Sequence, residues 1–205
     1  MTAAAVAGET LLAVESLSLE RGGRQLFDGL SFLVQPGHLI QVQGANGAGK
    51  TSLMRILAGL SRHGFEGSVK RTAELLYLGH HSAVKGLLSP RENLAWHPSG
   101  VEQYSDSAIE QALADVGLYG YEDVPSHALS AGQHRRVNLA RLHLSSAAIW
   151  LLDEPFTAID TEGVASLETV LQGHLERGGA VILSSHQVLN ISYRVHLLSL
   201  QEGLL

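Results

Sequence analysis

The residues with the clearest chemistry form a glycine-rich segment that ends in a lysine and a threonine. It matches the pattern G-x-x-x-x-G-K-[ST] and consists of Gly44, Ala45, Asn46, Gly47, Ala48, Gly49, Lys50 and Thr51. Because glycines let successive backbone N–H groups turn inward, such a loop can hold phosphate groups through its backbone. Lys50 supplies a charge for the β- and γ-phosphates, and Thr51 supplies a hydroxyl for Mg²⁺. The segment, with the adjoining Ser52, therefore predicts a nucleoside triphosphate site.

Two acidic residues, Asp153 and Glu154, follow an apolar segment at residues 148–152. Parallel sheets present functional side chains at the carboxyl ends of their strands, and this segment has the character of a buried strand. Asp153 suits a water-mediated contact with Mg²⁺, and Glu154 suits a general base for the water that attacks the γ-phosphorus. Alternatively, both acids cap the turn before Pro155. The phosphate loop favours the catalytic interpretation.

A third candidate is the segment Leu-Ser-Ala-Gly-Gln at residues 129–133. Ser130 and Gln133 have the spacing of a capping box, which explains both residues without a ligand. Gly132 is not explained by that motif. A serine hydroxyl and exposed N–H groups at a helix N-terminus also suit a phosphate that arrives from outside. Both interpretations remain open at this point.

Hydrophobic periodicity predicts the elements that position these residues. The loop lies between an extended apolar segment and a helix, and an antiparallel β unit precedes it. Later segments alternate between helices and short, continuously apolar strands of the parallel type. The predicted strands cover residues 12–19, 26–34, 39–42, 67–69, 75–78, 149–152 and 180–183, with one or two closing strands near 195–198; helices follow the loop, cover much of 89–120, begin at 130 and cover 161–175.

Composition limits the class of protein. A chain of 205 residues with 45% hydrophobic residues suits one α/β domain, and a net charge of −6 does not suit a nucleic-acid partner. The absence of cysteine excludes disulfides. The longest apolar run, residues 147–152, is far shorter than the roughly 20 residues that span a bilayer, and residues 1–7 lack the basic region of a signal peptide. We expect a soluble protein that contacts membranes only through a partner.

The motifs, in their order along the chain, resemble those of ABC-type ATPases. The resemblance rests on the phosphate loop, L-S-x-G-Q, the strand with Asp-Glu-Pro, residues 157–160 and His186. It covers nearly the whole chain. It implies the α/β fold of a P-loop NTPase of ABC type, with a mostly parallel sheet core, an antiparallel β subdomain and a helical subdomain at about residues 82–145. Residues 1–205 would form a single nucleotide-binding domain that binds ATP and Mg²⁺.

The resemblance also implies a head-to-tail dimer with two ATP molecules at its interface. Ser130 and Gly132 of one copy would contact the γ-phosphate held by Lys50 of the other. Asp160 would lie in the loop that crosses the interface, and His186 would hydrogen-bond the γ-phosphate or the attacking water. The implied catalytic residues are Lys50, Glu154 and His186.

Three positions depart from the family pattern. Ala131 replaces the first glycine of the usual L-S-G-G-Q. His81 stands where the family has a glutamine near the γ-phosphate, and we group it with Thr51 and Asp153 as predicted metal-site residues. No aromatic residue is available near residue 21 to stack on adenine, so Arg21 is the candidate through its planar guanidinium.

Further segments resemble the ATP-binding subunits of haem exporters in cytochrome c maturation. They are residues 26–32, 77–80, 85, 92–94 and 135–137. This resemblance implies ATP hydrolysis coupled to haem export or to release of a haem-loaded chaperone, at the cytoplasmic face of the bacterial inner membrane. The partners would be transmembrane subunits of a cytochrome c maturation complex, docked between His81 and Trp96, with Leu87, Leu88 and Trp96 as apolar candidates. Direct haem binding by this chain is not expected.

Other functions remain as alternatives. An ABC transporter for another substrate would have an ATPase subunit of the same kind, because the membrane subunits, which are other chains, determine the substrate. A nucleotide-binding module with little hydrolysis is suggested by His81 and Ala131, but Lys50, Asp153 and Glu154 favour hydrolysis. A family member that acts on DNA or ribosomes would need a long coiled-coil arm or two tandem domains, which 205 residues do not accommodate.

Overall fold

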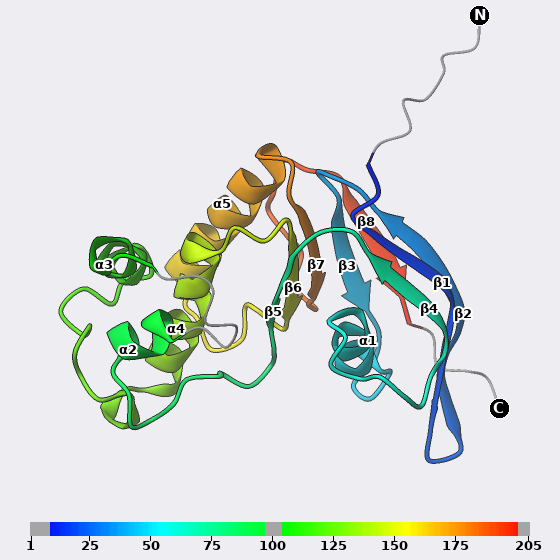
Figure 1. Ribbon diagram of the computed structural model, residues 1–205, viewed down its shortest axis with the longest axis horizontal. Helices are drawn as coiled ribbons and strands as arrows, with labels where there is room; N and C mark the ends of the chain where they lie inside the picture. Colours follow the sequence, from blue (N-terminus) through cyan, green and yellow to red (C-terminus); the bar gives the residue numbers. More distant parts are fainter. Residues whose placement is uncertain (1–8, 97–103, 201–205) are drawn as a thin grey trace, which may run out of the picture.

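The protein folds into two β-sheets and a set of helices, as seen in a computed structural model that describes residues 9–96 and 104–200 (Figure 1). One sheet is antiparallel, with the order β2-β1-β4, and the other is parallel, with the order β5-β6-β7-β3-β8. The antiparallel strands are β1 (Leu12–Arg21), β2 (Arg24–Val34) and β4 (Glu66–Arg71). The parallel strands are β3 (Leu39–Gln43), β5 (Leu75–Leu78), β6 (Ile149–Asp153), β7 (Ala180–Ser184) and β8 (Val195–Ser199). The predicted α/β architecture is confirmed.

The antiparallel sheet contains an irregularity in β1. Strand β1 pairs with both β2 and β4, and its register shifts between Val14 and Leu17. Ser16, within that shift, has a φ of 48°. A Cβ at Gly67 of β4 would lie 2.4 Å from the Ser16 carbonyl oxygen, so only glycine fits opposite the irregularity.

Helix α1 (Lys50–Leu57) packs between the two sheets (Figure 1). Its buried Leu53, Met54 and Leu57 share one hydrophobic cluster with residues of β1 and β2. Side chains alternate across a strand, so only every second residue of the parallel sheet joins this cluster. Those residues are Ile40, Val42, Ile149, Leu151, Ala180 and Ile182. Strand β3 and helix α1 thus fix the loop between them at both ends.

The opposite face of the parallel sheet is covered by α4 (Ala131–Leu144) and α5 (Thr161–Glu176). The other set of alternating residues, including Trp150, Leu152 and Val181, packs there against Leu167 and Leu171 of α5. Both faces of the sheet are therefore buried, which explains the continuously apolar β6 and β7.

A helical region lies between β5 and β6, as predicted, and extends to one side of the sheets in Figure 1. It contains α2 (Pro90–Ala95), α3 (Asp106–Asp115), a 3₁₀ turn η1 (Ser126–Ala128) and α4, with its own cluster that includes Leu94, Ile109 and Val137. Ser89 and Glu92 form a capping box at the start of α2. Residues 97–103 of the predicted helical segment lie outside the described residues.

Two further expectations concern the closing strands of the sheet and membrane-spanning segments. One closing strand, β8, is present among the described residues, and it pairs in parallel with β3. Across residues 9–96 and 104–200, every helix is too short or too polar to cross a bilayer.

Candidate functional site

The carboxyl ends of three neighbouring parallel strands bring the predicted catalytic residues together. Strand β7 lies between β6 and β3 in the sheet, and all three run in the same direction. The phosphate loop follows β3, Asp153 ends β6, and His186 comes two residues after β7. Segments separated by more than 100 residues therefore meet at one edge of the sheet.

The phosphate loop has the backbone conformations that the motif requires. Gly47 and Gly49 have φ values of 85° and 99°, in the region that favours glycine. A Cβ at Gly49 would lie 3.1 Å from the Cβ of Leu26 and 3.3 Å from the ring of Phe27. Gly49 precedes α1 and places no side-chain cap on its first N–H groups. These N–H groups and the helix dipole together suit an anion.

Lys50, Glu154 and His186 form the polar centre of the site. The Nζ of Lys50 donates to the carbonyl oxygens of Gly44, at 2.8 Å, and Ala45, at 3.3 Å. It also lies 3.3 Å from Nε2 of His186, and that atom lies 3.8 Å from Oε1 of Glu154. The Lys50 cation and the Glu154 carboxylate thus both lie close to the His186 imidazole. Such a group suits charge neutralisation and proton transfer at a phosphate.

Asp153 has one satisfied and one unsatisfied carboxylate oxygen. Its Oδ1 accepts a hydrogen bond from the Ser184 hydroxyl at 2.7 Å. Its Oδ2 is buried and has no hydrogen-bond partner among the described residues. A buried carboxylate oxygen without a donor fits a cation or a cation-bound water. Thr51, the other predicted metal-site residue of this edge, is exposed at the start of α1.

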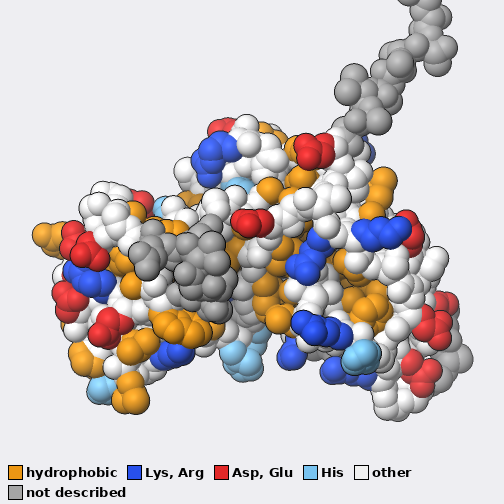
Figure 2. All heavy atoms as spheres, in the orientation of Figure 1, with side chains coloured by type: hydrophobic (Ala, Val, Ile, Leu, Met, Phe, Trp, Pro, Cys, Tyr) orange, Lys and Arg blue, Asp and Glu red, His pale blue; other side chains and the backbone are white. Residues whose placement is uncertain are grey.

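A cavity of about 580 Å³ covers this edge and has the size of a small-molecule site. Basic side chains gather on this lobe, which contains α1 and the antiparallel sheet (Figure 2), and they suit an anionic ligand. Arg21, the candidate for adenine, is in the lining, and His80 is there instead of the predicted His81. The lining consists of Arg21, Arg24, Leu26, Asn46, Gly47, Gly49, Lys50, Thr51, Ser52, His80, Asp153 and Glu154.

Three predicted site residues lie elsewhere in the chain. Ser130 caps α4 in the predicted capping box: its Oγ accepts from the N–H of Gln133 at 3.2 Å, and its own N–H donates to that side chain at 2.9 Å. Asp160 caps α5, and its Oδ2 pairs with Arg136 at 2.8 Å. A Cβ at Gly132 would lie 3.2 Å from the carbonyl oxygen of Ala158. Within one chain, none of the three lines the phosphate-loop cavity.

Three buried polar residues support the site and were not predicted. The amide of Gln41 donates to the carbonyl oxygens of Ser185 and Gln187, at 3.0 and 2.9 Å, which flank His186. Ser184 Oγ accepts from the N–H of Glu154 at 2.9 Å. Arg135 of α4 donates to carbonyl oxygens at the end of β6. A polar residue inside an apolar strand was the available signal for Gln41 and Ser184.

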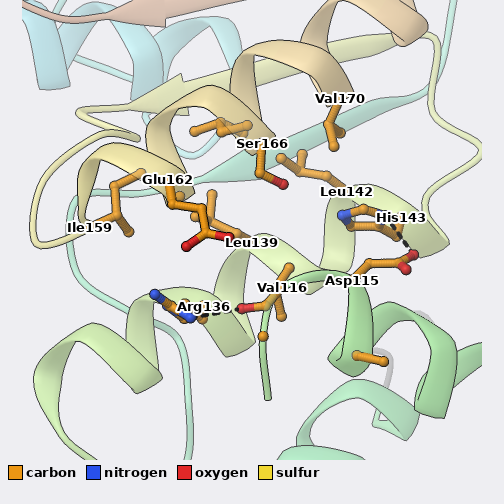
Figure 3. Close-up of a pocket in the computed structure, with 14 residues that line it drawn as sticks. Asp115, Val116, Arg136, Leu139, Leu142, His143, Ile159, Glu162, Ser166 and Val170 are labelled. Atoms are coloured by element: carbon orange, nitrogen blue, oxygen red, sulfur yellow. Dashed lines mark hydrogen bonds and ion pairs between the residues drawn. The ribbon is translucent and has the colours of Figure 1, made fainter. Parts of the chain in front are cut away.

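A second cavity, of about 420 Å³, lies between the end of α3, α4 and the start of α5 (Figure 3). Arg136 and His143 in its lining are paired: Arg136 contacts Asp160 and donates to the Val116 carbonyl, and His143 lies 3.2 Å from Asp115. None of the predicted site residues lines it. The phosphate-loop cavity is therefore the candidate active site.

Known proteins share both the sequence and the fold. The ABC transporter family model matches residues 27–157. The cytochrome c biogenesis ATP-binding export protein CcmA of Pseudomonas fluorescens is 48% identical, with 88% of this chain and 90% of the relative covered. The protein of the same name from Hahella chejuensis is 46% identical, with 94% and 97% covered.

Solved structures agree on the fold. An ATP-binding protein of a putative ABC transporter from Pyrococcus furiosus is 26% identical and superimposes with a TM-score of 0.77, with 92% of this chain and 96% of that chain covered. An ATP-binding cassette solved as a dimer in a post-hydrolysis state with ADP and Pi gives a TM-score of 0.82 at 17% identity, with 94% and 95% covered. The resemblance found in the motifs is confirmed, and this chain belongs to the ABC transporter family, in which it is an ABC-type ATPase.

Proposed function

We propose that this chain is the ATP-hydrolysing subunit of a membrane complex that exports haem, or releases a haem-loaded chaperone, in cytochrome c maturation. The observation that carries this proposal is the identity of 46% to 48% with ATP-binding export proteins named for cytochrome c biogenesis, over most of both chains. An ABC transporter for another substrate is the alternative. Both functions use the same ATPase chemistry, so the test must follow the cargo.

The catalytic roles follow from the geometry of the polar centre. Glu154 takes a proton from the attacking water, because its carboxylate is the base beside the phosphate loop. His186, between Glu154 and Lys50, orients that water or the γ-phosphate. Lys50 exchanges its carbonyl partners for the β- and γ-phosphate oxygens. The loop N–H groups hold the phosphates from the backbone side.

Mg²⁺ is the cofactor that these residues fit. When bound with the nucleotide, it would neutralise negative charge on the phosphates, so that the water attacking the phosphorus is repelled less. The Thr51 hydroxyl and the free Oδ2 of Asp153, directly or through water, would hold it. His80 replaces His81 in this proposal, because His80 lines the cavity and His81 does not.

We propose a head-to-tail dimer of this chain as the active assembly. Ser130, Gly132 and Asp160 lie outside the phosphate-loop cavity of their own chain, which supports a site that is shared between two copies. The Ser130 oxygen accepts from Gln133, which leaves its O–H free to donate to a phosphate. In this proposal residues 1–205 act as one nucleotide-binding domain, with residues 82–145 as its helical subdomain.

The transmembrane partner is proposed to dock between His81 and Trp96, and the chain is proposed to lie at the cytoplasmic face of the inner membrane. Leu87 is 91% exposed and Trp96 is 50% exposed, whereas Leu88 is half-buried. Large exposed apolar side chains of this kind suit a protein partner. The segment begins directly after His80, which lines the active-site cavity. A partner bound there would contact His81, the neighbour of that lining residue.

The test uses cells whose only copy of this protein carries Glu154→Gln. We expect loss of covalent haem from c-type cytochromes, measured by haem staining, while total haem and b-type cytochromes stay at wild-type levels. Glu66→Gln, an exposed acid in β4, is the matched control and should leave c-type haem intact. Normal c-type haem with Glu154→Gln would contradict the haem assignment and favour another cargo.

A further inference from the structure

Arg135 is a buried cation of α4 that faces the end of strand β6. Its side chain is enclosed, since the residue is only 6% exposed. Its guanidinium donates to the carbonyl oxygens of Pro155 at 3.3 Å, Asp153 at 3.4 Å and Glu154 at 2.5 Å. One side chain of the helical region is therefore hydrogen-bonded to three consecutive peptide groups at the catalytic edge.

The same guanidinium reaches a second part of the site. Its Nη1 donates to the carbonyl oxygen of Gly79 at 3.3 Å. Gly79 immediately precedes His80, which lines the phosphate-loop cavity. Arg135 thus joins α4 to both the β6 end and the segment after β5.

The backbone of Glu154 needs such support. Its φ is 51°, in the left-handed region that residues other than glycine rarely occupy. Its N–H donates to Ser184 Oγ, and its carbonyl oxygen accepts from Arg135. The peptide group on each side of the Glu154 Cα is therefore held by a buried side chain.

Only arginine can make this set of contacts. Its planar guanidinium carries five N–H donors in a fixed fork, whereas the lysine ammonium is a compact point charge. Four carbonyl oxygens around one side chain match the fork. The contacts go to backbone atoms, so Arg135 does not itself reach the cavity that receives the nucleotide.

We propose that Arg135 is a positioning residue for ATP hydrolysis, which holds the backbone of Glu154 in its left-handed conformation. The orientation of the general base then depends on helix α4. The inference rests on the proposed role of Glu154. Ser130, the residue proposed to meet the nucleotide of a second copy, is the N-cap of helix α4. Arg135, five residues later, gives that end of the helix a direct connection to the hydrolytic carboxylate of its own chain.

The test compares two arginines of the same helix in the full-length protein. Arg135→Met removes the donors to the site, and Arg141→Met is the control, because Arg141 donates to the Asn93 carbonyl of α2 at 3.0 Å, away from the cavity. We expect both variants to lose thermal stability. Only Arg135→Met should lower kcat, by at least tenfold, with KM and the Kd for ATP within twofold of wild type. Equal loss of kcat in both variants would show a merely structural role and overturn the inference.

A second measurement separates this inference from the role of Glu154. In single-turnover reactions, Glu154→Gln alone should be slow, and adding Arg135→Met should slow it by less than twofold, because both changes disable one carboxylate. An independent tenfold loss in the double variant would contradict action through Glu154. Full activity of Glu154→Gln would overturn the general-base role, and this inference with it.

A conservative variant keeps the test decisive if Arg135→Met does not fold. Arg135→Lys retains the charge and loses the fork, so we expect a folded protein, by circular dichroism and ATP binding, with kcat reduced at least threefold. Wild-type kcat in a folded Arg135→Lys, with Glu154→Gln slow, would overturn the positioning role and leave the proposed function standing.

Discussion

The histidines at the two ends of the parallel sheet lie in opposite environments. At the carboxyl end, the side chain of His186 is 58% exposed and lies beside Lys50 and Glu154. At the amino end, His174 of α5 is 7% exposed and stacks on Trp150, with ring centroids 3.7 Å apart and an interplanar angle of 4°. His186 lies beside the phosphate-loop lysine, and His174 is part of the core.

The difference is set by surroundings and not by residue type. Burial lowers the pKa of His174 to about 4, so this side chain is neutral at physiological pH and packs as an aromatic ring. His186 has a charged partner on each side and contact with solvent. We therefore expect changes at His186 to affect hydrolysis, and changes at His174 to affect stability.

The largest expected effect is on hydrolysis at the carboxyl end. His186→Ala should lower kcat by about 10²- to 10³-fold, the range for loss of one hydrogen-bonding group directed at the charge of the transition state. Its melting temperature should remain close to wild type, because the side chain is mostly exposed. His174→Phe is the matched control, since it keeps an aromatic ring on Trp150 and should retain kcat. A kcat within twofold of wild type for His186→Ala would contradict the proposed difference between the roles of His186 and His174.

The second effect is on stability in acid, at the amino end. The pKa of His174 is about 4 in the folded state against 6.5 for an unperturbed histidine, so the unfolded chain binds more protons between these values. The contribution is fully present above pH 6.5 and is lost as the pH falls towards 4, by up to about 3 kcal/mol. Urea unfolding of wild type and His174→Phe at pH 7 and 4.5 measures it. Identical pH dependence in the two proteins would contradict the prediction.

The smallest effect concerns the space that His174 occupies. A Cβ at Gly179 would lie 2.2 Å from Nε2 of His174, whose ring is held against Trp150. Gly179→Ala should therefore lower the free energy of unfolding by about 1 to 3 kcal/mol, the usual cost of overpacking, with kcat per folded chain unchanged. Gly86→Ala, where the nearest atom is 3.6 Å away, is the control. If adding His174→Ala does not relieve the loss, the ring is not the obstacle.

Much of the fold follows from local sequence. Apolar runs predicted the strands of the parallel sheet, and Ser130 with Gln133 predicted a capping box that the structure confirms. The phosphate loop could be recognised because its chemistry resides in consecutive residues and their backbone. The domain boundaries and the roles of the site residues stay predictions, although the family and the fold are confirmed.

Only the tertiary structure decided which distant residues meet. Strand β4 was predicted as a strand, but its pairing with β1 depends on the path of the chain after α1. His80 and His81 are adjacent in sequence, and the turn after β5 determines that His80 lines the cavity. Gln41 and Arg135 donate to backbone carbonyls of other segments, and the sequence does not indicate which carbonyls these are.

The physical reason is the range of each interaction. The sequence by itself determined the loop, the strands and the helix starts, because apolar periodicity and capping are local properties of neighbouring residues. The order of strands in the sheet, β6-β7-β3, determined that Glu154 and His186 lie beside Lys50. That order is a property of the whole packed chain, in which both faces of the sheet are buried.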